Sequence, residues 1–373
     1  MTGENSTFLI PAPDGLDSAA ADILGRMLDS GAAAAVLGPF SSDDGRPEHR
    51  LASKSGFLSE LALFSPVFAG NIASAASRLS RMGPLPQKVA LLARPCEAAA
   101  IVELAKIQQI DMDSFIIILA DCAGTADVEQ GKSISDVSAA LASASTLEDP
   151  RPVCGVCTRT GPQKDADIIF GAWGLDKKLM VAAVSEKGQD VLKSAYGNKL
   201  DGGVIPEDAH MARKNAIEKV MSARSENRIA MLEQLSGTHT GIKGLKETLK
   251  ECIVCRNCSE VCPICYCKDC KFKLEPMETE GSIPLLSAVN RGCIRFPMDP
   301  LYFHLGRMVH MAESCINCGA CSDACPNGID VASVFLLASE SVQAAFSYKA
   351  GQDKDEARPL TCYLEDEFEE LGR

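Results

Sequence analysis

Nowhere in the 373 residues does an apolar stretch approach the roughly 20 residues that a helix needs to cross a bilayer. Positive charge is also scarce, because 37 lysine and arginine residues are set against 50 acidic residues and leave a net charge of −13. Such a chain offers no basic surface for nucleic acid. Its first seven residues are polar and lack the pattern of a secretory signal. We therefore expect a cytoplasmic protein with no membrane span and no nucleic-acid partner.

A nicotinamide-binding motif is missing as well. No G-x-G-x-x-G fingerprint stands between an expected strand and an expected helix, and the run from Gly171 to Gly174 is too short to replace it. The chain also lacks a molybdenum-pterin or nickel-iron signature. Primary oxidation of a substrate is therefore expected on a partner subunit. Trp173 is the single tryptophan, and packing is favoured for it over contact with a cofactor.

Cysteine is abundant, with 17 residues that stand mostly in C-x2-C clusters. Without an export signal, this pattern indicates metal ligation rather than disulfides. Residues 252–263 and 315–326 each read C-x2-C-x2-C-x3-C-P, the spacing of bacterial ferredoxins, in which the fourth cysteine of each copy reaches the other 4Fe-4S cluster. The expected ligand sets are therefore crossed. One set is Cys252, Cys255, Cys258 and Cys325, and the other is Cys315, Cys318, Cys321 and Cys262.

Zinc is the alternative occupant of these motifs, but zinc sites commonly pair two C-x2-C hooks across a longer loop. The insert of 52 residues between Cys262 and Cys315 contains four more cysteines, which could hold a further cluster: Cys265, Cys267, Cys270 and Cys293. The alternative for Cys293 is a role as a small buried hydrophobic residue.

Upstream of the motifs the chain alternates strands and helices. Apolar runs predict strands at 89–93 and 115–120 around a helix at 96–109. Such a unit makes the two strands parallel. Further expected elements are a helix at 18–28, a surface connection at 125–149, strands at 167–170 and 178–184, a charged helix at 205–235 and a helix at 301–312.

Four cysteines of this upstream region are enough for one more cluster. Cys96 and Cys122 follow the two predicted parallel strands, so they should be neighbours at the carboxyl edge of the sheet, where α/β proteins bind cofactors. Cys154 and Cys157 form a hook that could complete the set. The alternative is that Cys96 and Cys122 are ordinary buried residues. Cys362 has no partner in this scheme.

The upstream segments resemble a known family. The segments are 88–100 (KVALLARPCEAAA), 116–125 (IIILADCAGT), 151–157 (RPVCGVC) and 166–171 (ADIIFG), with residues 185–188 (SEKG) after them. They are similar to the beta subunits of deazaflavin-reducing hydrogenases and of formate dehydrogenases. The resemblance implies an FAD-binding domain in which Cys96, Cys122, Cys154 and Cys157 hold a cluster beside the flavin. It also implies candidate flavin contacts at Gly124, Thr125, Asp167, Gly171 and Gly174.

The predicted fold is an α/β flavin-binding domain followed by an α+β bacterial-ferredoxin-like iron-sulfur domain. The expected divisions are 1–82, 83–236, 237–346 and an acidic, peripheral tail at 347–373. The resemblance implies an electron-transfer subunit that serves a formate dehydrogenase or hydrogenase catalytic subunit, or a heterodisulfide-reductase-type complex. The alternatives are a flavin-free polyferredoxin-type carrier that docks redox partners and a zinc-stabilised interaction protein.

Other polar residues have simpler interpretations. His304 and His310 are six residues apart on the helix expected at 301–312, so packing is favoured over shared ligation. The basic residues of 213–228 could meet an anionic cofactor or partner, but Glu218 and Glu226 among them favour a solvated helix face.

Overall fold

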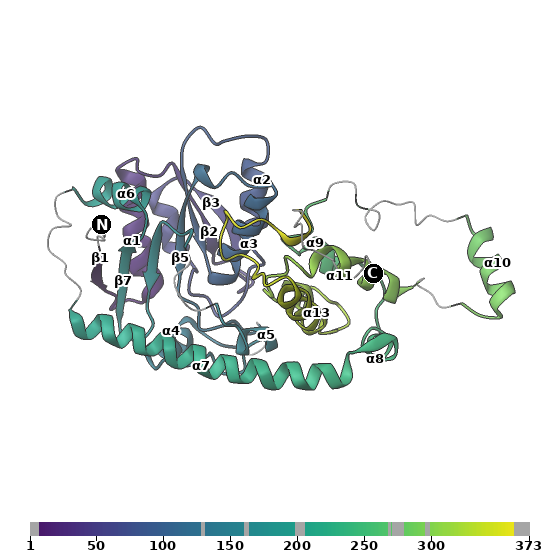
Figure 1. Ribbon diagram of the computed structural model, residues 1–373. Coiled ribbons are helices and arrows are strands. Elements are labelled where there is room, and N and C mark those ends of the chain that lie inside the picture. Colours follow the sequence, from purple (N-terminus) through teal and green to yellow (C-terminus); the bar gives the residue numbers. More distant parts are fainter. Residues whose placement is uncertain are drawn as a thin grey trace, which may run out of the picture.

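A seven-stranded sheet with the order β1-β7-β6-β5-β4-β2-β3 organises the first two thirds of the chain (Figure 1). The computed structural model describes residues 7–127, 131–159, 164–197, 206–267, 270, 280–294 and 299–361. We call residues 7–238 the sheet part and residues 241–361 the dicluster part. The long helix α7 (Glu207–Thr238) leads from the first to the second.

Four parallel strands form the middle of the sheet and are buried along their whole length: β2 (Ala35–Phe40), β4 (Val89–Ala93), β5 (Phe115–Ala120) and β6 (Ile168–Gly171). Near-continuous apolar runs suit this position, because helices cover both faces of a parallel sheet. The antiparallel strands at the two sides are β1 (Thr7–Pro11), β7 (Lys178–Ala183) and β3 (Glu48–Ala52).

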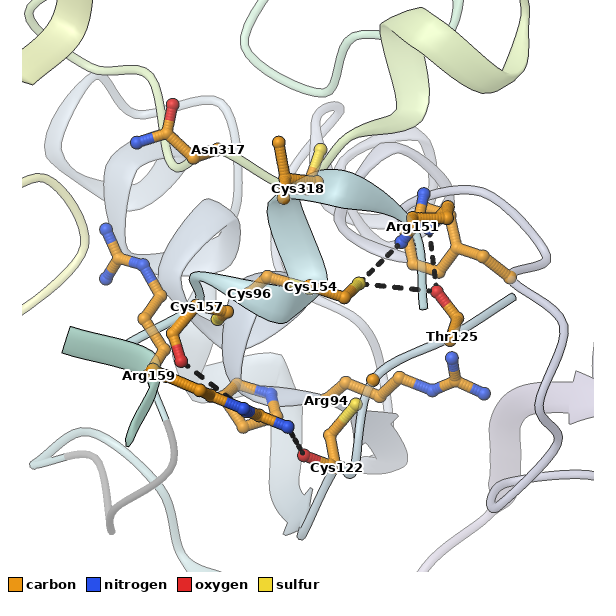
Figure 2. Close-up of a pocket in the computed structure, with 15 residues that line it drawn as sticks. Arg94, Cys96, Cys122, Thr125, Arg151, Cys154, Cys157, Arg159, Asn317 and Cys318 are labelled. Atoms are coloured by element: carbon orange, nitrogen blue, oxygen red, sulfur yellow. Dashed lines mark hydrogen bonds between the residues drawn. The ribbon is translucent and has the colours of Figure 1, made fainter. Parts of the chain in front are cut away.

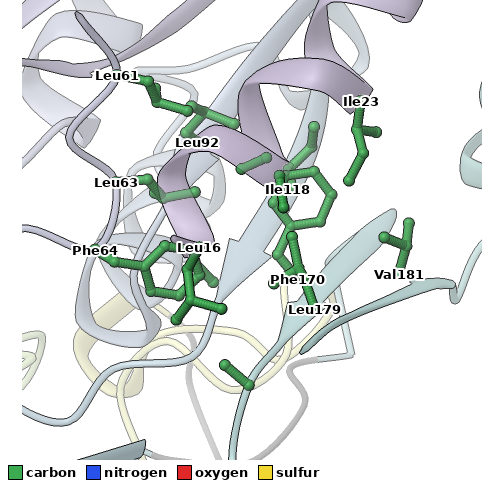
Figure 3. Packing of buried hydrophobic residues seen from close by; sticks show 14 of the residues in the cluster. Leu16, Ile23, Leu61, Leu63, Phe64, Leu92, Ile118, Phe170, Leu179 and Val181 are labelled. Atoms are coloured by element: carbon green, nitrogen blue, oxygen red, sulfur yellow. The ribbon is translucent and has the colours of Figure 1, made fainter. Parts of the chain in front are cut away.

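Two apolar layers cover the sheet. One layer packs α1 (Leu16–Asp29), α4 (Ile134–Ala142) and α6 (Glu186–Tyr196) against side chains such as Ile118 and Phe170 (Figure 3). The second layer contains α2 (Ala73–Ser80) and α3 (Pro95–Lys106) and continues without a break into the dicluster part. The two parts of the chain therefore share one hydrophobic layer, which fixes how their cysteines face each other.

The strands predicted at 89–93 and 115–120 are confirmed, and they pair in parallel as expected. The helices predicted upstream and downstream are confirmed with shifts of a few residues at their ends. The expected surface connection at 125–149 is wrong in its middle, since α4 lies there and Leu141 is fully buried. The predicted division at residue 83 rests on a change in composition. Strands from both sides of this residue belong to the same sheet, so the sheet does not divide there.

The described residues of the dicluster part contain helices and no strand, so the predicted α+β character is not seen there. These helices are α8 (Gly241–Thr248), α9 (Asn257–Glu260), α10 (Ser282–Arg291), α11 (Pro300–Met311), α12 (Ala320–Asp323), α13 (Val331–Ala345) and the short η6 (Pro359–Thr361). Among the described helices of the whole chain, none combines the length and the apolar character that a membrane crossing requires.

The segment at 347–361 returns to the sheet part, so the prediction of a peripheral tail is wrong for these residues. Glu103 of α3 is 1% exposed and accepts hydrogen bonds from the Tyr348 hydroxyl at 2.5 Å and from the Gly351 N–H at 2.8 Å. Arg358 pairs with the buried Glu313 of the dicluster part. The segment therefore ties the two parts together. The tail beyond residue 361, including Cys362, lies outside the described residues.

Asp17 on α1 predicts a pH-dependent stability. Burial raises its pKa from 3.8 to about 6, although its Oδ1 accepts the Phe64 N–H at 3.0 Å. The folded state therefore favours the protonated carboxyl, and its stability falls as pH rises from about 4 through 6, by roughly 3 kcal/mol at most. Asp17→Asn keeps the acceptor and removes the charge.

We expect Asp17→Asn to be more stable than the wild type at pH 8, with a difference that shrinks as pH falls to 5. Melting temperatures of both proteins across this range test the expectation. A difference in melting temperature that does not change with pH would contradict the raised pKa of Asp17 in the folded state.

Candidate metal centres

Three cavities of similar size, about 410, 450 and 330 Å³, are each lined by four or five cysteines. We call them the upstream, inner and outer cavities. Cys96, Cys122, Cys154, Cys157 and Cys318 line the upstream cavity. Cys262, Cys315, Cys318 and Cys321 line the inner cavity. Cys252, Cys255, Cys258 and Cys325 line the outer cavity. The last two groups are the crossed sets that the spacing predicts, and Cys318 borders both the upstream and the inner cavity.

The two ferredoxin-type loops share an unusual backbone. Val254 and Arg256 of the first motif have φ of 52° and 70°, and the equivalent residues Asn317 and Gly319 of the second have 57° and 82°. A left-handed conformation is costly for residues other than glycine, and above all for a β-branched one. The strain recurs at equivalent positions because each loop must curl around its cavity. One result is a contact from the Val254 N–H to the Cys252 sulfur at 3.4 Å.

The upstream cavity lies at the carboxyl edge of the parallel sheet. Cys96 stands in the first turn of α3, directly after β4, and Cys122 follows β5. Cys154 belongs to the short helix α5 (Pro152–Gly155), and Cys157 comes two residues after it. Figure 2 shows these four cysteines around the cavity, with Cys318 of the dicluster part on one side. The parallel pairing of β4 and β5 is what makes Cys96 and Cys122 neighbours.

Arg151 connects the upstream cavity with the dicluster part. Its guanidinium is buried and donates to the Thr125 hydroxyl at 2.7 Å and to the Cys154 sulfur at 3.5 Å (Figure 2). It also pairs with Asp323 of α12. Burial opposes ionisation of Cys154, but the positive charge of Arg151 and the hydrogen bond from Thr125 outweigh it and lower the pKa of this thiol. Burial raises the pKa of the Cys96 and Cys122 thiols instead. Cys154 is therefore the most acidic of these three.

Helix α7 sends two buried arginines toward the same edge. Arg213 pairs with Asp121, whose Oδ2 also accepts the backbone N–H of Trp173 at 3.0 Å. Arg224 is 2% exposed and lies over the Trp173 ring at 5.8 Å. Its guanidinium donates to the backbone carbonyl oxygens of Cys122 and Cys157, two of the residues that line the cavity. The prediction of a solvated face at 213–228 is therefore wrong for these two arginines, while packing of Trp173 is confirmed.

Helix α11 presents His304 to the outer cavity and Arg307 to the inner one, and leaves His310 exposed. The Nε2 of His304 lies 3.4 Å from the Cys252 sulfur, and burial lowers the pKa of this histidine to about 4, so it is neutral at pH 7. Arg307 is 3% exposed and donates to the Cys258 sulfur at 3.1 Å. The two histidines lie on different faces of the helix, as their spacing predicts, with His304 buried and His310 exposed. Contacts of His304 and Arg307 with cysteine sulfur were not predicted from sequence, where the only signal is their i, i+3 spacing.

The candidate flavin contacts are not all together. Gly124 and Thr125 line the upstream cavity. Asp167 precedes β6 and so lies at the opposite end of this strand, where it pairs with Lys187 at 2.9 Å. A Cβ at Gly171 would lie 2.8 Å from the Arg213 guanidinium, and a Cβ at Gly174 would lie 2.7 Å from a carbonyl oxygen of α7. The surroundings of Asp167, Gly171 and Gly174 are therefore filled by the chain's own side chains and backbone.

The insert cysteines lie in two places. Cys265 and Cys267 line a groove of about 710 Å³ together with Cys262, and the Cys265 sulfur lies 3.5 Å from the Met311 sulfur. Cys293 is exposed just after α10, and its contact is with the carbonyl oxygen of the next residue at 3.8 Å. Cys270 is partly buried. The structure does not bring Cys293 into the groove that holds Cys265 and Cys267.

Comparison with known proteins agrees with these motifs. The family model for the 4Fe-4S dicluster domain matches residues 248–329. The chain is 27% identical over 306 residues to the F420-dependent formate dehydrogenase subunit beta of Methanocaldococcus jannaschii, which covers 72% of this chain and 74% of the relative. It is 30% identical over 315 residues to the F420-dependent formate dehydrogenase 1 subunit beta of Methanococcus maripaludis, which covers 73% of this chain and 75% of that relative.

A chain in the xenon-derivatised structure of the F420-reducing [NiFe] hydrogenase complex from Methanosarcina barkeri is also similar, with a TM-score of 0.40 and 13% identity over 64% of this chain and 93% of that one. No conclusion rests on a likeness at this level. The two formate dehydrogenase relatives and the matched 4Fe-4S dicluster domain identify the family. The chain therefore belongs to the beta-subunit family of F420-dependent formate dehydrogenases, with a 4Fe-4S dicluster domain in its C-terminal part, and it is an oxidoreductase subunit.

Proposed function

We propose that the chain is the flavin- and iron-sulfur-containing electron-transfer subunit of a formate dehydrogenase or hydrogenase-type complex. The observation that carries the proposal is the series of three cysteine-lined cavities, which share Cys318 at one junction and the crossed motifs at the other. Bound 4Fe-4S clusters would each carry one electron, and bound FAD would exchange electrons in pairs with a two-electron acceptor. The residues of this chain would hold, order and electrostatically support these groups.

Three ligand sets follow from this proposal. The upstream set is Cys96, Cys122, Cys154 and Cys157, the inner set is Cys315, Cys318, Cys321 and Cys262, and the outer set is Cys252, Cys255, Cys258 and Cys325. A fourth set of Cys265, Cys267, Cys270 and Cys293 would require Cys293 to move. This residue is exposed and does not line the groove that holds Cys265 and Cys267. The cavities fit an anionic cluster by their charge as well as by their thiols.

That fit is visible in the linings. No Asp or Glu is among the described residues that line the three cavities. The arginines that line them are Arg94, Arg151, Arg159 and Arg224 at the upstream one, Arg307 at the inner one and Arg256 at the outer one. A cluster with four thiolate ligands is negative, and buried negative charge needs compensation. The arginines supply it.

The place of the flavin is less fixed than the cluster sites. A groove borders the upstream cavity, and Phe68, Arg151 and Val153 line both. We propose contact at Gly124 and Thr125, which lie between β5 and this groove. The filled surroundings of Asp167, Gly171 and Gly174 do not fit a flavin contact.

A flavin-free, polyferredoxin-type carrier is the second candidate function. It is favoured by the groove itself, because three carboxylates line it, Asp127, Asp323 and Asp330, against two arginines, of which Arg151 is already paired with Asp323. Carboxylates are unfavourable neighbours for the pyrophosphate of FAD. In either case we propose that the partner is a catalytic formate dehydrogenase or hydrogenase subunit. We propose a heterodisulfide-reductase-type complex as a second partner, and the cytoplasm as the location of the complex.

Anaerobic purification of the full chain tests the proposal through iron, acid-labile sulfide, zinc and released flavin per chain. We expect about 12 irons, an equal amount of sulfide and about one FAD. About 8 irons with no flavin would reduce the function to the flavin-free carrier. Colourless protein that contains zinc without sulfide would rule out both candidates.

A further inference from the structure

A single buried guanidinium lies between the inner and outer cavities. Arg307 donates from Nη1 to the Cys258 sulfur and from Nη2 to the Cys258 carbonyl oxygen, both at 3.1 Å, and so faces the outer ligand set. The same side chain lines the inner cavity beside Cys262 and Cys321. Its charge therefore acts on both ligand sets from one position.

Aromatic rings hold this guanidinium in place. It lies 4.7 Å from the centre of the Phe335 ring of α13 and 5.8 Å from that of Phe303, on its own helix. Arg307 is 3% exposed, so water is excluded from the charge, which strengthens its interaction with nearby anions. The fixed position makes Arg307 a preorganised cation rather than a mobile surface charge.

The guanidinium has no carboxylate partner among the residues that the structure describes. The ion pairs found there join other arginines and lysines to acidic groups, and the Nε of Arg307 has no hydrogen-bond partner within them. A buried, unpaired charge is strongly unfavourable, and an apolar side chain of similar size would pack between the two rings without that cost. The compensating negative charge must come from the cysteine thiolates and the groups that they hold.

We propose that Arg307 is the shared counter-charge of the two dicluster sites and raises the reduction potential of both bound clusters. This inference rests on the proposed function, because it requires clusters in both cavities. Reduction adds one electron, and hence one negative charge, to a cluster that is already anionic. A fixed cation in contact with both sites stabilises the reduced form of each more than the oxidised form. No proton is transferred, since the guanidinium stays charged throughout.

The test is a redox titration of the full, reconstituted chain followed by electron paramagnetic resonance, with dithionite as the reductant and mediators present. Arg307→Met removes the charge and fills the space between the rings, and Arg307→Lys keeps the charge. Arg50→Gln is the matched control, because Arg50 is a surface residue that pairs with Glu48 and Glu60 away from the three cavities. Iron and sulfide are measured on every variant before titration.

We expect Arg307→Met to make both dicluster clusters at least tenfold harder to reduce at a given potential, which is a shift of about −59 mV for a one-electron couple. Arg307→Lys should shift them by less, and Arg50→Gln not at all. The upstream cluster, identified by the loss of its signal in Cys96→Ala, should keep its potential. A shift of only one dicluster cluster, or of none with full iron, would overturn the inference while leaving the proposed function intact.

Loss of iron in the variants is also decisive. If Arg307→Met loses dicluster iron and Arg307→Lys keeps it, the positive charge is needed to hold the clusters, which supports the inference. If both variants lose the iron equally, the guanidinium acts through its hydrogen-bond geometry, and the counter-charge role is wrong. Absence of dicluster iron from the wild type would contradict the proposed function itself.

Discussion

Replacing Cys96 by alanine should lower the iron content of the chain by about four atoms, while both dicluster clusters remain. Cys96 lies in the first turn of α3 and lines the cavity that Cys122, Cys154 and Cys157 share. Removal of one ligand from a buried four-thiolate site leaves an iron without its protein bond. Anaerobic iron and sulfide analysis, together with the loss of one electron paramagnetic resonance signal, measures the result.

Two further substitutions make this experiment specific. Cys255→Ala should also remove about four irons, but the lost signal should be that of the outer set, because Cys255 lines the outer cavity. Cys362→Ala should leave the iron content unchanged, since the sequence assigns no partner to that cysteine. Unchanged iron in Cys96→Ala would refute the upstream ligand set and leave a chain with the dicluster sites alone.

The cysteine groups were predictable because their determinants are local. Each ferredoxin-type motif carries its loop geometry within a dozen residues, and the crossed grouping follows from the position of the fourth cysteine. Cys96 and Cys122 required one more step, the parallel pairing of β4 and β5, which their uniformly apolar sequences indicate. Local spacing and one topological rule were enough to group these residues, although their occupancy by clusters is still a prediction.

The arginines at the cavities could not be predicted in this way. Charged residues are usually exposed, so a solvated face was favoured for the stretch that contains Arg224, and the sequence around Arg151 and Arg307 contains no sign that these two are buried. Their burial becomes understandable only when the cysteines from distant segments meet around them. Strand β2 was also missed, because Gly38 and Pro39 interrupt its apolar run and usually indicate turns. Tertiary packing overrode the local preference at these positions.

The return of residues 347–361 to α3 was hidden for a similar reason. The acidic composition that follows Gly351 predicts a solvated end, yet the contacts that matter are made by a tyrosine, a glycine and an arginine. Buried Glu103 accepts from Tyr348 and Gly351, and it also pairs with Lys106 at 3.1 Å. A buried carboxylate with such partners is costly to disturb. This short segment therefore adds buried polar contacts to the hydrophobic layer that the sheet part and the dicluster part share.

Gly351→Ala should break these contacts. Gly351 has φ of 74°, and a Cβ there would lie 2.4 Å from the Cβ of Ala99 and 2.6 Å from the Cα and carbonyl oxygen of the same residue. The backbone of α3 cannot yield as a flexible side chain would, so we expect a loss of about 3 kcal/mol in stability from overpacking and backbone strain combined.

Gly31→Ala is the matched control, because Gly31 has φ of 72° and open space around its Cβ position. The control should lose only about 1 kcal/mol from the backbone. Thermal unfolding measures both losses, and limited proteolysis should separate the sheet part from the dicluster part in Gly351→Ala alone. Equal losses in the two variants would mean that the close approach of Gly351 to α3 does not hold the two parts together.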